Sequence, residues 1–191
     1  MSPEHKIIII TAPSGAGKTS ITRHLLKTFP GKLAFSISAA TRQKREYEKD
    51  GVDYHFIGVD EFKEKIQNND FIEWEMVYEG KYYGTLKSEI RRIWKEDKTP
   101  LLDIDVQGAV HLQQEHPERT LSIFIEPPSV DELKKRLQGR GTETPENLAT
   151  RLNKASYELT FKDQFTKVII NDNLEKACKE AEEIVDKFIN S

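Results

Sequence analysis

The segment from Ala12 to Thr19 is rich in glycine and ends in Lys-Thr. It follows a short run of β-branched apolar residues and precedes a helical pattern, which is the context that a phosphate-binding P-loop requires. The backbone N–H groups of such a loop and the N-terminus of the next helix present positive charge to a polyphosphate. We expect Lys18 to reach the outer phosphates of a nucleoside triphosphate and the Thr19 hydroxyl to hold Mg²⁺. The residues expected to bind this nucleotide are Ala12, Pro13, Ser14, Gly15, Ala16, Gly17, Lys18 and Thr19.

Ala12 stands where the usual P-loop has its first glycine. This position must therefore tolerate a Cβ atom, and we expect a negative φ there. The alternative interpretation is a glycine-rich turn with a chance lysine. The strand and helix patterns on either side make that alternative the weaker one.

Two aspartates, Asp103 and Asp105, follow Leu101 and Leu102 at the carboxyl end of a predicted buried strand. Ligands of open α/β sheets bind at that end of the strands. Residues two apart in a strand share a face, so both carboxylates are expected on one side. We assign Asp103 to the Mg²⁺ shell, directly or through water. The alternative for Asp105 is that it only caps the following helix.

The residues from Asp105 to Gly108 also fit the D-x-x-G switch of GTPases. The guanine-reading N-K-x-D motif is absent, because the only Asn-Lys pair, at Asn153, is followed by Ala-Ser. A GTPase with this sequence would lack its base reader. We therefore give the GTPase interpretation little weight.

Two arginines three residues apart, Arg42 and Arg45, precede Tyr54 in a charged segment. Guanidinium groups bind phosphate oxygens in pairs, and phenol hydroxyls donate further hydrogen bonds. This set suits a phosphate monoester. A solvated charged loop is the alternative, which the residues alone leave equally open.

Short apolar runs alternate with helical patterns along most of the chain. Because strands that alternate with helices form parallel sheets covered on both faces, we predict such a core. The first helix is expected from Lys18 to about Phe29. The predicted strands are Lys6–Thr11, Leu101–Val106, Leu121–Ile125 and Val168–Ile170.

Two segments interrupt this alternation. Residues 35–83 are rich in aromatic residues, glycine and charge, which predicts a small, mostly β lobe. Residues 127–157 suggest a charged helical pair, in which Ser129 and Glu132 form a capping box. In the first segment we expect strands at Phe35–Ser38, Tyr54–Ile57 and Phe71–Val77 and a helix at Asp60–Asn68. A helix at Thr85–Trp94 is expected to follow that segment, and the second segment should contain a helix at Glu146–Tyr157.

Composition limits the class of protein. The 191 residues are 37% hydrophobic and 32% charged, with a formal net charge of −3. These values argue against disorder and against a main role in binding nucleic acid. The single cysteine, Cys178, excludes an internal disulfide and fits a reducing compartment. There is no membrane-length apolar stretch and no secretory signal pattern, so we expect a cytoplasmic protein.

Eight blocks of characteristic residues follow one another along the chain. They are Ala12–Thr19, Ser38–Glu48 (Ser-x-x-Thr-Arg-x-x-Arg-x-x-Glu), Gly51–Tyr54, Phe71–Trp74, Tyr82–Thr85, Leu102–Gly108, Pro127–Ser129 and Gly139–Gly141. Taken in order, these blocks resemble those of guanylate kinases over nearly the whole chain, residues 6 to 188. The resemblance implies an α/β fold: a P-loop three-layer parallel-sheet core, an inserted β-rich GMP-binding lobe and a helical lid. The core is expected to comprise residues 1–34, 95–126 and 160–191, the GMP-binding lobe residues 35–94, and the lid residues 127–159.

The resemblance implies transfer of the γ-phosphoryl group from ATP to GMP, giving ADP and GDP, in purine nucleotide metabolism and GMP recycling. It assigns the GMP phosphate to Arg42, Arg45, Tyr54 and Tyr83, and guanine to Ser38, Glu73, Thr85 and Asp105. Glu48 and Asp103 complete the expected substrate site. A fixed carboxylate such as Glu73 accepts both the N1–H and the 2-amino group of guanine. With adenine, the carboxylate would face the unprotonated N1, and two acceptors would meet without a proton between them. Adenine should therefore be rejected strongly.

The resemblance also implies three lid arginines, Arg136, Arg140 and Arg151, that place positive charge over the γ-phosphate. Together with Lys18 and Arg45, these are the expected catalytic residues. Asn171 and Asp172 match the adenine-side contacts of the family. The alternatives are a solvated basic helix face for the lid and an ordinary turn and helix-cap pair for Asn-Asp.

Two rival functions stay open on sequence grounds. One is a kinase for another nucleoside monophosphate, against which Glu73 and Asp105 argue. The other is a noncatalytic scaffold, against which the retained Lys18, Thr19, Arg140 and Arg151 argue. The expected ligands are ATP with Mg²⁺ and GMP or dGMP, with no nucleic acid or membrane partner. A monomer or a homodimer is expected.

Overall fold

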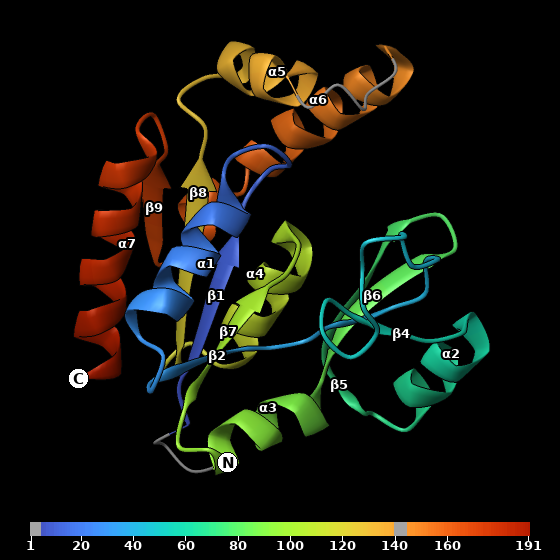
Figure 1. Ribbon diagram of the computed structural model, residues 1–191. Coiled ribbons are helices and arrows are strands. Elements are labelled where there is room, and N and C mark those ends of the chain that lie inside the picture. The colour runs from blue at the N-terminus through green and yellow to red at the C-terminus, as the bar shows by residue number, and fades with distance from the viewer. Residues whose placement is uncertain (1–4, 140–144) are drawn as a thin grey trace.

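The computed structural model describes residues 5–139 and 145–191 (Figure 1). Its core is a five-stranded sheet with the strand order β2-β7-β1-β8-β9. All neighbouring strands pair in parallel, which confirms the predicted sheet. The strands are β1 (Ile7–Thr11), β2 (Leu33–Phe35), β7 (Thr99–Asp103), β8 (Thr120–Glu126) and β9 (Lys167–Ile170).

Both faces of this sheet are covered by helices. On β1, Ile8 and Ile10 belong to a core with α1 (Lys18–Thr28) and α7 (Leu174–Ile189). Ile7 and Ile9 belong to a second core with α3 (Lys87–Lys95) and α4 (Val106–Glu115). A strand buried on both faces is apolar at every position, which explains the continuous run of isoleucines.

The inserted lobe contains a four-stranded sheet with the order β4-β3-β6-β5. Helix α2 (Val59–Gln67) covers it through Phe62, whose ring stacks on Phe71 with centroids 4.3 Å apart. A separate apolar cluster around these rings holds the lobe together. Its strands are β3 (Ala39–Ala40), β4 (His55–Phe56), β5 (Phe71–Tyr78) and β6 (Lys81–Leu86).

Two predicted elements of this region are wrong. The strand expected at Phe35–Ser38 is β2, which ends at Phe35 and pairs with β7 of the core sheet. The helix expected from Thr85 begins at Lys87, because Thr85 lies in β6 and pairs with Glu73 of β5. Antiparallel pairing with β5, a tertiary effect, overrides the local helical pattern there. Helix α3 then packs Ile90 into the core cluster.

Helices α5 (Val130–Gln138) and α6 (Pro145–Leu159) form a separate pair, at the top of Figure 1. The Ser129 hydroxyl accepts the Glu132 N–H at 3.1 Å, which confirms that Ser129 caps α5. Leu133, Leu137 and Ala155 form their small shared core. A one-turn 3₁₀ helix, η1 (Lys162–Gln164), connects α6 to β9.

None of the helices in the described part of the chain is both long and apolar enough to cross a membrane.

Candidate active site

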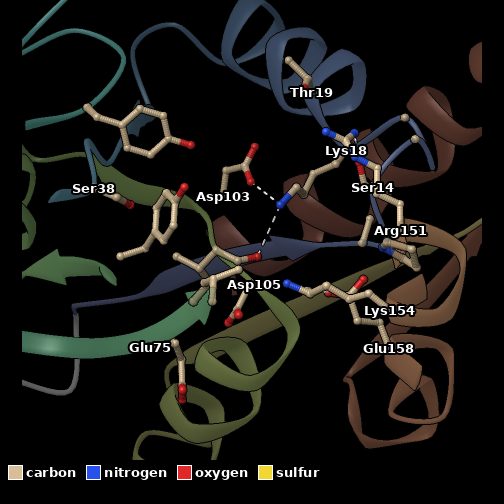
Figure 2. Close-up of a pocket in the computed structure, with 18 of the residues that line it drawn as sticks. Ser14, Lys18, Thr19, Ser38, Glu75, Asp103, Asp105, Arg151, Lys154 and Glu158 are labelled. Atoms are coloured by element: carbon tan, nitrogen blue, oxygen red, sulfur yellow. Dashed lines mark hydrogen bonds and ion pairs between the residues drawn. The ribbon is translucent and has the colours of Figure 1, made fainter. Parts of the chain in front are cut away.

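A cavity of about 360 Å³ lies where the P-loop, the β lobe and α6 meet. Figure 2 shows Lys18, Asp103 and Asp105 facing this space, with Arg151, Lys154 and Glu158 entering it from α6. The structure thus brings residues from distant parts of the sequence to one site. The predicted residues that line it are Ala12, Pro13, Ser14, Gly15, Gly17, Lys18, Thr19, Ser38, Tyr54, Glu73, Tyr83, Asp103, Asp105 and Arg151.

The P-loop follows β1 and turns through two glycines with positive φ, 94° at Gly15 and 101° at Gly17. Residues with a Cβ rarely adopt such angles, so glycine is required at both positions. The non-glycine residues with positive φ in the described ranges are Asn69 and Asp97. Ala12 therefore keeps a negative φ, as expected from its Cβ.

Asn171 supports the P-loop from the side of β9. Its amide Nδ2 donates to the Ala16 carbonyl at 2.7 Å, and the residue is only 4% exposed. A Cβ at Gly17 would overlap this nitrogen. Asn171 thus holds the loop, and its expected contact with adenine stays a prediction. Asp172 is exposed next to it, outside the set of cavity-lining residues that the structure describes.

Lys18 forms an ion pair with Asp103 and donates to the Ile104 carbonyl at 3.4 Å, as the dashed lines in Figure 2 mark. Burial by itself would lower the pKa of Lys18. The facing Asp103 carboxylate outweighs that effect, and the pKa is raised above its ordinary value. The ammonium group is therefore charged and directed into the cavity.

Asp103 ends β7, whereas Asp105 lies beyond the strand and caps α4 through the Gly108 N–H at 2.9 Å. The expectation that a shared strand face aligns the two aspartates is therefore wrong. Both nevertheless line the cavity, because the chain turns at the carboxyl end of the sheet. Asp105 acts as a helix cap and is also a cavity residue.

Glu73 is the buried carboxylate of the lobe. It is 9% exposed, and its Oε1 accepts the Thr85 hydroxyl at 2.6 Å across the β5–β6 pair. Burial raises the pKa of Glu73 to about 7. Nearby, the rings of Tyr54 and Tyr83 meet edge to face with centroids 6.0 Å apart. Ser38 and Thr85 are buried beside this group.

The lobe arginines have protein partners. Arg42 donates two hydrogen bonds to Glu48, at 2.6 and 2.5 Å, and its guanidinium lies 4.9 Å from the centroid of the Tyr54 ring. The Arg42 hydrogen bonds lower the pKa of Glu48 to about 2. Arg45 donates to the Tyr47 hydroxyl at 2.8 Å, and its N–H donates to Glu48. Arg42, Arg45 and Glu48 are not among the cavity-lining residues that the structure describes, but Arg42 lies against the ring of Tyr54, which is one of them.

The lid arginines differ in position. Arg151 of α6 donates to the Ser14 hydroxyl of the P-loop at 3.2 Å. Arg136 of α5 donates to the Asn171 carbonyl at 3.0 Å, so it points to the end of β9. Arg140 lies outside the described residues.

Three charged residues that line the cavity are not predicted from the sequence: Glu75, Lys154 and Glu158. The spacing 151, 154, 158 places Arg151, Lys154 and Glu158 on one helix face, a signal that could have found the last two. Burial raises the pKa of Glu158, although Lys154 and Lys18 oppose that effect. Glu75 follows Glu73 by two residues on β5, and its carboxylate lies 2.9 Å from His111 Nδ1.

The family model and the curated relatives both indicate one family. The guanylate kinase family model matches residues 4–188. A guanylate kinase of Bacteroides thetaiotaomicron is 47% identical over 97% of this chain and 90% of its own length. That of Salinibacter ruber is 43% identical over 99% of this chain and 100% of its own length.

A solved structure of guanylate kinase from Anaplasma phagocytophilum aligns with a TM-score of 0.75 at 27% identity. It covers 98% of this chain and 87% of the other. These matches confirm the resemblance that the motifs indicate, and the chain belongs to the guanylate kinase family.

Proposed function

We propose that this chain transfers the γ-phosphoryl group of ATP to GMP within the cavity between P-loop, lobe and lid. Its family membership makes it an ATP:GMP phosphotransferase that forms ADP and GDP. The observation that best supports the site is that one cavity holds both Lys18 of the P-loop and the buried carboxylate of Glu73. The ammonium group of Lys18 can bind a polyphosphate, and the carboxylate of Glu73 can accept hydrogen bonds from guanine.

The ATP phosphates are bound by the P-loop. Its backbone N–H groups and the start of α1 face the cavity, and Lys18 adds a charged ammonium group. When phosphate oxygens arrive, they compete with Asp103 for this ammonium. Arg151 already reaches Ser14, so a small movement of α6 carries its guanidinium onto the outer phosphates.

Thr19 and Asp103 fit the expected Mg²⁺. Both line the cavity, and hydroxyl and carboxylate oxygens are the donors that this ion prefers. When bound, Mg²⁺ neutralises charge that develops on the phosphate oxygens. The two residues would hold it together with oxygens of ATP itself.

The GMP phosphate is bound by Arg42, Arg45, Tyr54 and Tyr83. Glu48 acts through Arg42, because its two carboxylate oxygens fix the plane of the guanidinium. The Tyr54 ring packs against the same guanidinium. Because its side chain is already held in one conformation, Arg42 can donate its remaining N–H groups to the GMP phosphate without a further loss of conformational entropy.

Guanine is selected by Glu73, with Ser38, Thr85 and Asp105 around it. Thr85 occupies one oxygen of Glu73 as a donor, which fixes the carboxylate. The ionised group then accepts the N1–H and the 2-amino group of the base. Adenine has an unprotonated acceptor at N1, so the carboxylate would face it lone pair to lone pair and would gain no N1–H donor.

In the transfer step, a phosphate oxygen of GMP forms a bond to the γ-phosphorus, and the bond between that phosphorus and the β,γ-bridging oxygen breaks. The electron pair of the broken bond leaves with ADP. Lys18, Arg45 and the lid arginines Arg136, Arg140 and Arg151 supply positive charge to the transferring group once the lid has closed. Closure must then move Arg136 away from the Asn171 carbonyl, to which it donates in this structure. Closure of residues 127–159 over the site excludes water, which would otherwise hydrolyse ATP.

The test is a coupled ADP-release assay with ATP and Mg²⁺ that compares GMP, dGMP, AMP, CMP and UMP. We expect turnover with GMP and little turnover with AMP, CMP and UMP, and the assay measures how well dGMP replaces GMP. Isothermal titration calorimetry measures GMP binding separately from catalysis, and so distinguishes a kinase from a noncatalytic scaffold. GMP binding without any GDP formed from ATP would favour the scaffold and overturn the proposal.

A further inference from the structure

Gly108 lies in the first turn of α4, directly against the base-selecting carboxylate. A Cβ built at this position would lie 2.5 Å from Oε2 of Glu73 and 3.4 Å from its Cδ. Contacts under 3.0 Å essentially never occur for a real Cβ atom. Any residue other than glycine would therefore displace the Glu73 carboxylate or the helix.

The backbone does not explain this glycine. Gly108 is helical, and the described glycines with positive φ are Gly15, Gly17, Gly51 and Gly80. Within a helix, glycine is less favourable than alanine, because it loses more conformational freedom. What requires glycine at position 108 is the approach of the Glu73 side chain.

Gly108 also contacts the second carboxylate of the site. Its N–H donates to Oδ1 of Asp105 at 2.9 Å, and the built Cβ would lie 3.3 Å from that same oxygen. On the other side, the Thr85 hydroxyl donates to Oε1 of Glu73. Glu73 is thus held between a hydroxyl on β6 and the bare Cα of Gly108, a contact between β5 and α4 that joins lobe and core.

We infer that Gly108 is a specificity-determining position that sets where Glu73 meets guanine. It acts by having no side chain, so that helix α4 can approach the carboxylate, while its amide orients Asp105. This inference rests on the proposed role of Glu73. A methyl group at this position rotates or shifts the Glu73 carboxylate, which then no longer accepts hydrogen bonds from both the N1–H and the 2-amino group of guanine.

The experiment uses Gly108→Ala, with Gly31→Ala as the matched control, because a Cβ at Gly31 meets nothing within 4 Å. Inosine monophosphate is the probe, since it keeps N1–H and lacks the 2-amino group. Losing one hydrogen bond to a charged group corresponds to about a tenfold to hundredfold effect. We expect kcat/KM for GMP to fall by that factor in Gly108→Ala, with a smaller fall for inosine monophosphate. The KM for ATP should stay within about twofold, and Gly31→Ala should match the unmodified protein.

Repeating the substitution in a Glu73→Asp variant keeps the test decisive if Gly108→Ala folds poorly in the otherwise unmodified protein. Glu73→Asp shortens the carboxylate by one methylene group and clears the added Cβ. Adding Gly108→Ala to Glu73→Asp should therefore change GMP kcat/KM by less than about threefold, as a double-mutant cycle reports. An equal fall in both backgrounds would overturn the inference, as would an unchanged ratio of GMP to inosine monophosphate in Gly108→Ala.

Glu73→Gln separates this inference from the proposed function. If Glu73→Gln leaves the preference for GMP intact, Glu73 does not read guanine and the assignment beneath the inference fails. If Glu73→Gln abolishes the preference and Gly108→Ala does not alter it, the role of Glu73 stands and the role of Gly108 is refuted.

Discussion

Replacing Glu73 by glutamine should make the protein more stable and less able to select GMP. The introduced amide would keep an oxygen that can accept the Thr85 hydroxyl, so the hydrogen bond at 2.6 Å has a replacement. What the substitution removes is a carboxylate that burial keeps from ionising until pH is about 7. The buried negative charge of Glu73 is needed to bind guanine, but it lowers the free energy of unfolding.

The size of the effect follows from the two pKa values. The pKa of Glu73 is about 7 in the folded protein, against a reference value of 4.5. Between these values the folded state binds more protons than the unfolded state, so stability falls as pH rises through this window. At 1.36 kcal/mol per pKa unit, the loss is about 1 kcal/mol at pH 5.5 and about 3 kcal/mol at pH 8.

Urea unfolding at pH 5.5 and pH 8 measures this effect. Titrating groups that do not interact with Glu73 contribute equally to both proteins, so the difference in unfolding free energy between Glu73→Gln and the unmodified chain reports mainly on Glu73. We expect the variant's advantage to grow by about 2 kcal/mol from pH 5.5 to pH 8. In parallel, kcat/KM for GMP should fall by a factor of about 10² or more, because a neutral amide cannot accept two donors with the same strength.

A stability difference that is the same at both pH values would refute the linkage reasoning. Unchanged GMP selectivity would refute the base-reading role. The two outcomes are independent, because one measures the free energy of unfolding and the other measures binding of the base. Thr85→Val is a useful companion variant, since it removes the hydroxyl that fixes Glu73 and should raise the GMP KM without removing the charge.

Four further outcomes are expected. The KM for GMP should be about tenfold higher at pH 6 than at pH 8, because the base requires ionised Glu73, and the pH profile of Glu73→Gln should lack this component. Lys18→Ala should fold, as circular dichroism would show, yet lose kcat by about 10²–10³, since one preorganised charge on the phosphates is gone; full activity would contradict its role. Arg151→Ala should lower kcat by about 10³ with little change in GMP affinity by titration calorimetry, and a change only in affinity would argue against a lid role. Glu48→Gln should raise the GMP KM about tenfold, because Arg42 loses its bidentate partner, and equal KM values would show that Arg42 needs no such support.

Much of the fold was predictable because its signals are local. Several local patterns each predict the backbone over a few residues. They are the run of isoleucines in β1, the glycines at 15 and 17 and the capping serine at 129. The parallel sheet follows from strands that alternate with helices. The same local signals misplaced β2 and the start of α3, where pairing with distant strands decided the boundaries.

The candidate site was predictable in part. Motif spacing predicted the P-loop and Lys18, and the family resemblance predicted Glu73; all of these line the cavity. Motif spacing did not show that Asn171 supports the Ala16 carbonyl, since those residues are 155 positions apart. Nor did it place Lys154 and Glu158 in the cavity, because that depends on how α6 packs against the core.

Residue types and their local spacing are enough to predict which chemical groups this protein has available, because charge, hydroxyl groups and glycine flexibility belong to individual residues and their near neighbours. Which of these groups meet depends on how the helices and strands pack. The contact between Gly108 and Glu73 shows the physical reason: a carboxylate on β5 and a bare Cα on α4 come within van der Waals reach only when lobe and core pack together. Distances of that kind depend on the packing of whole elements, which no local pattern encodes.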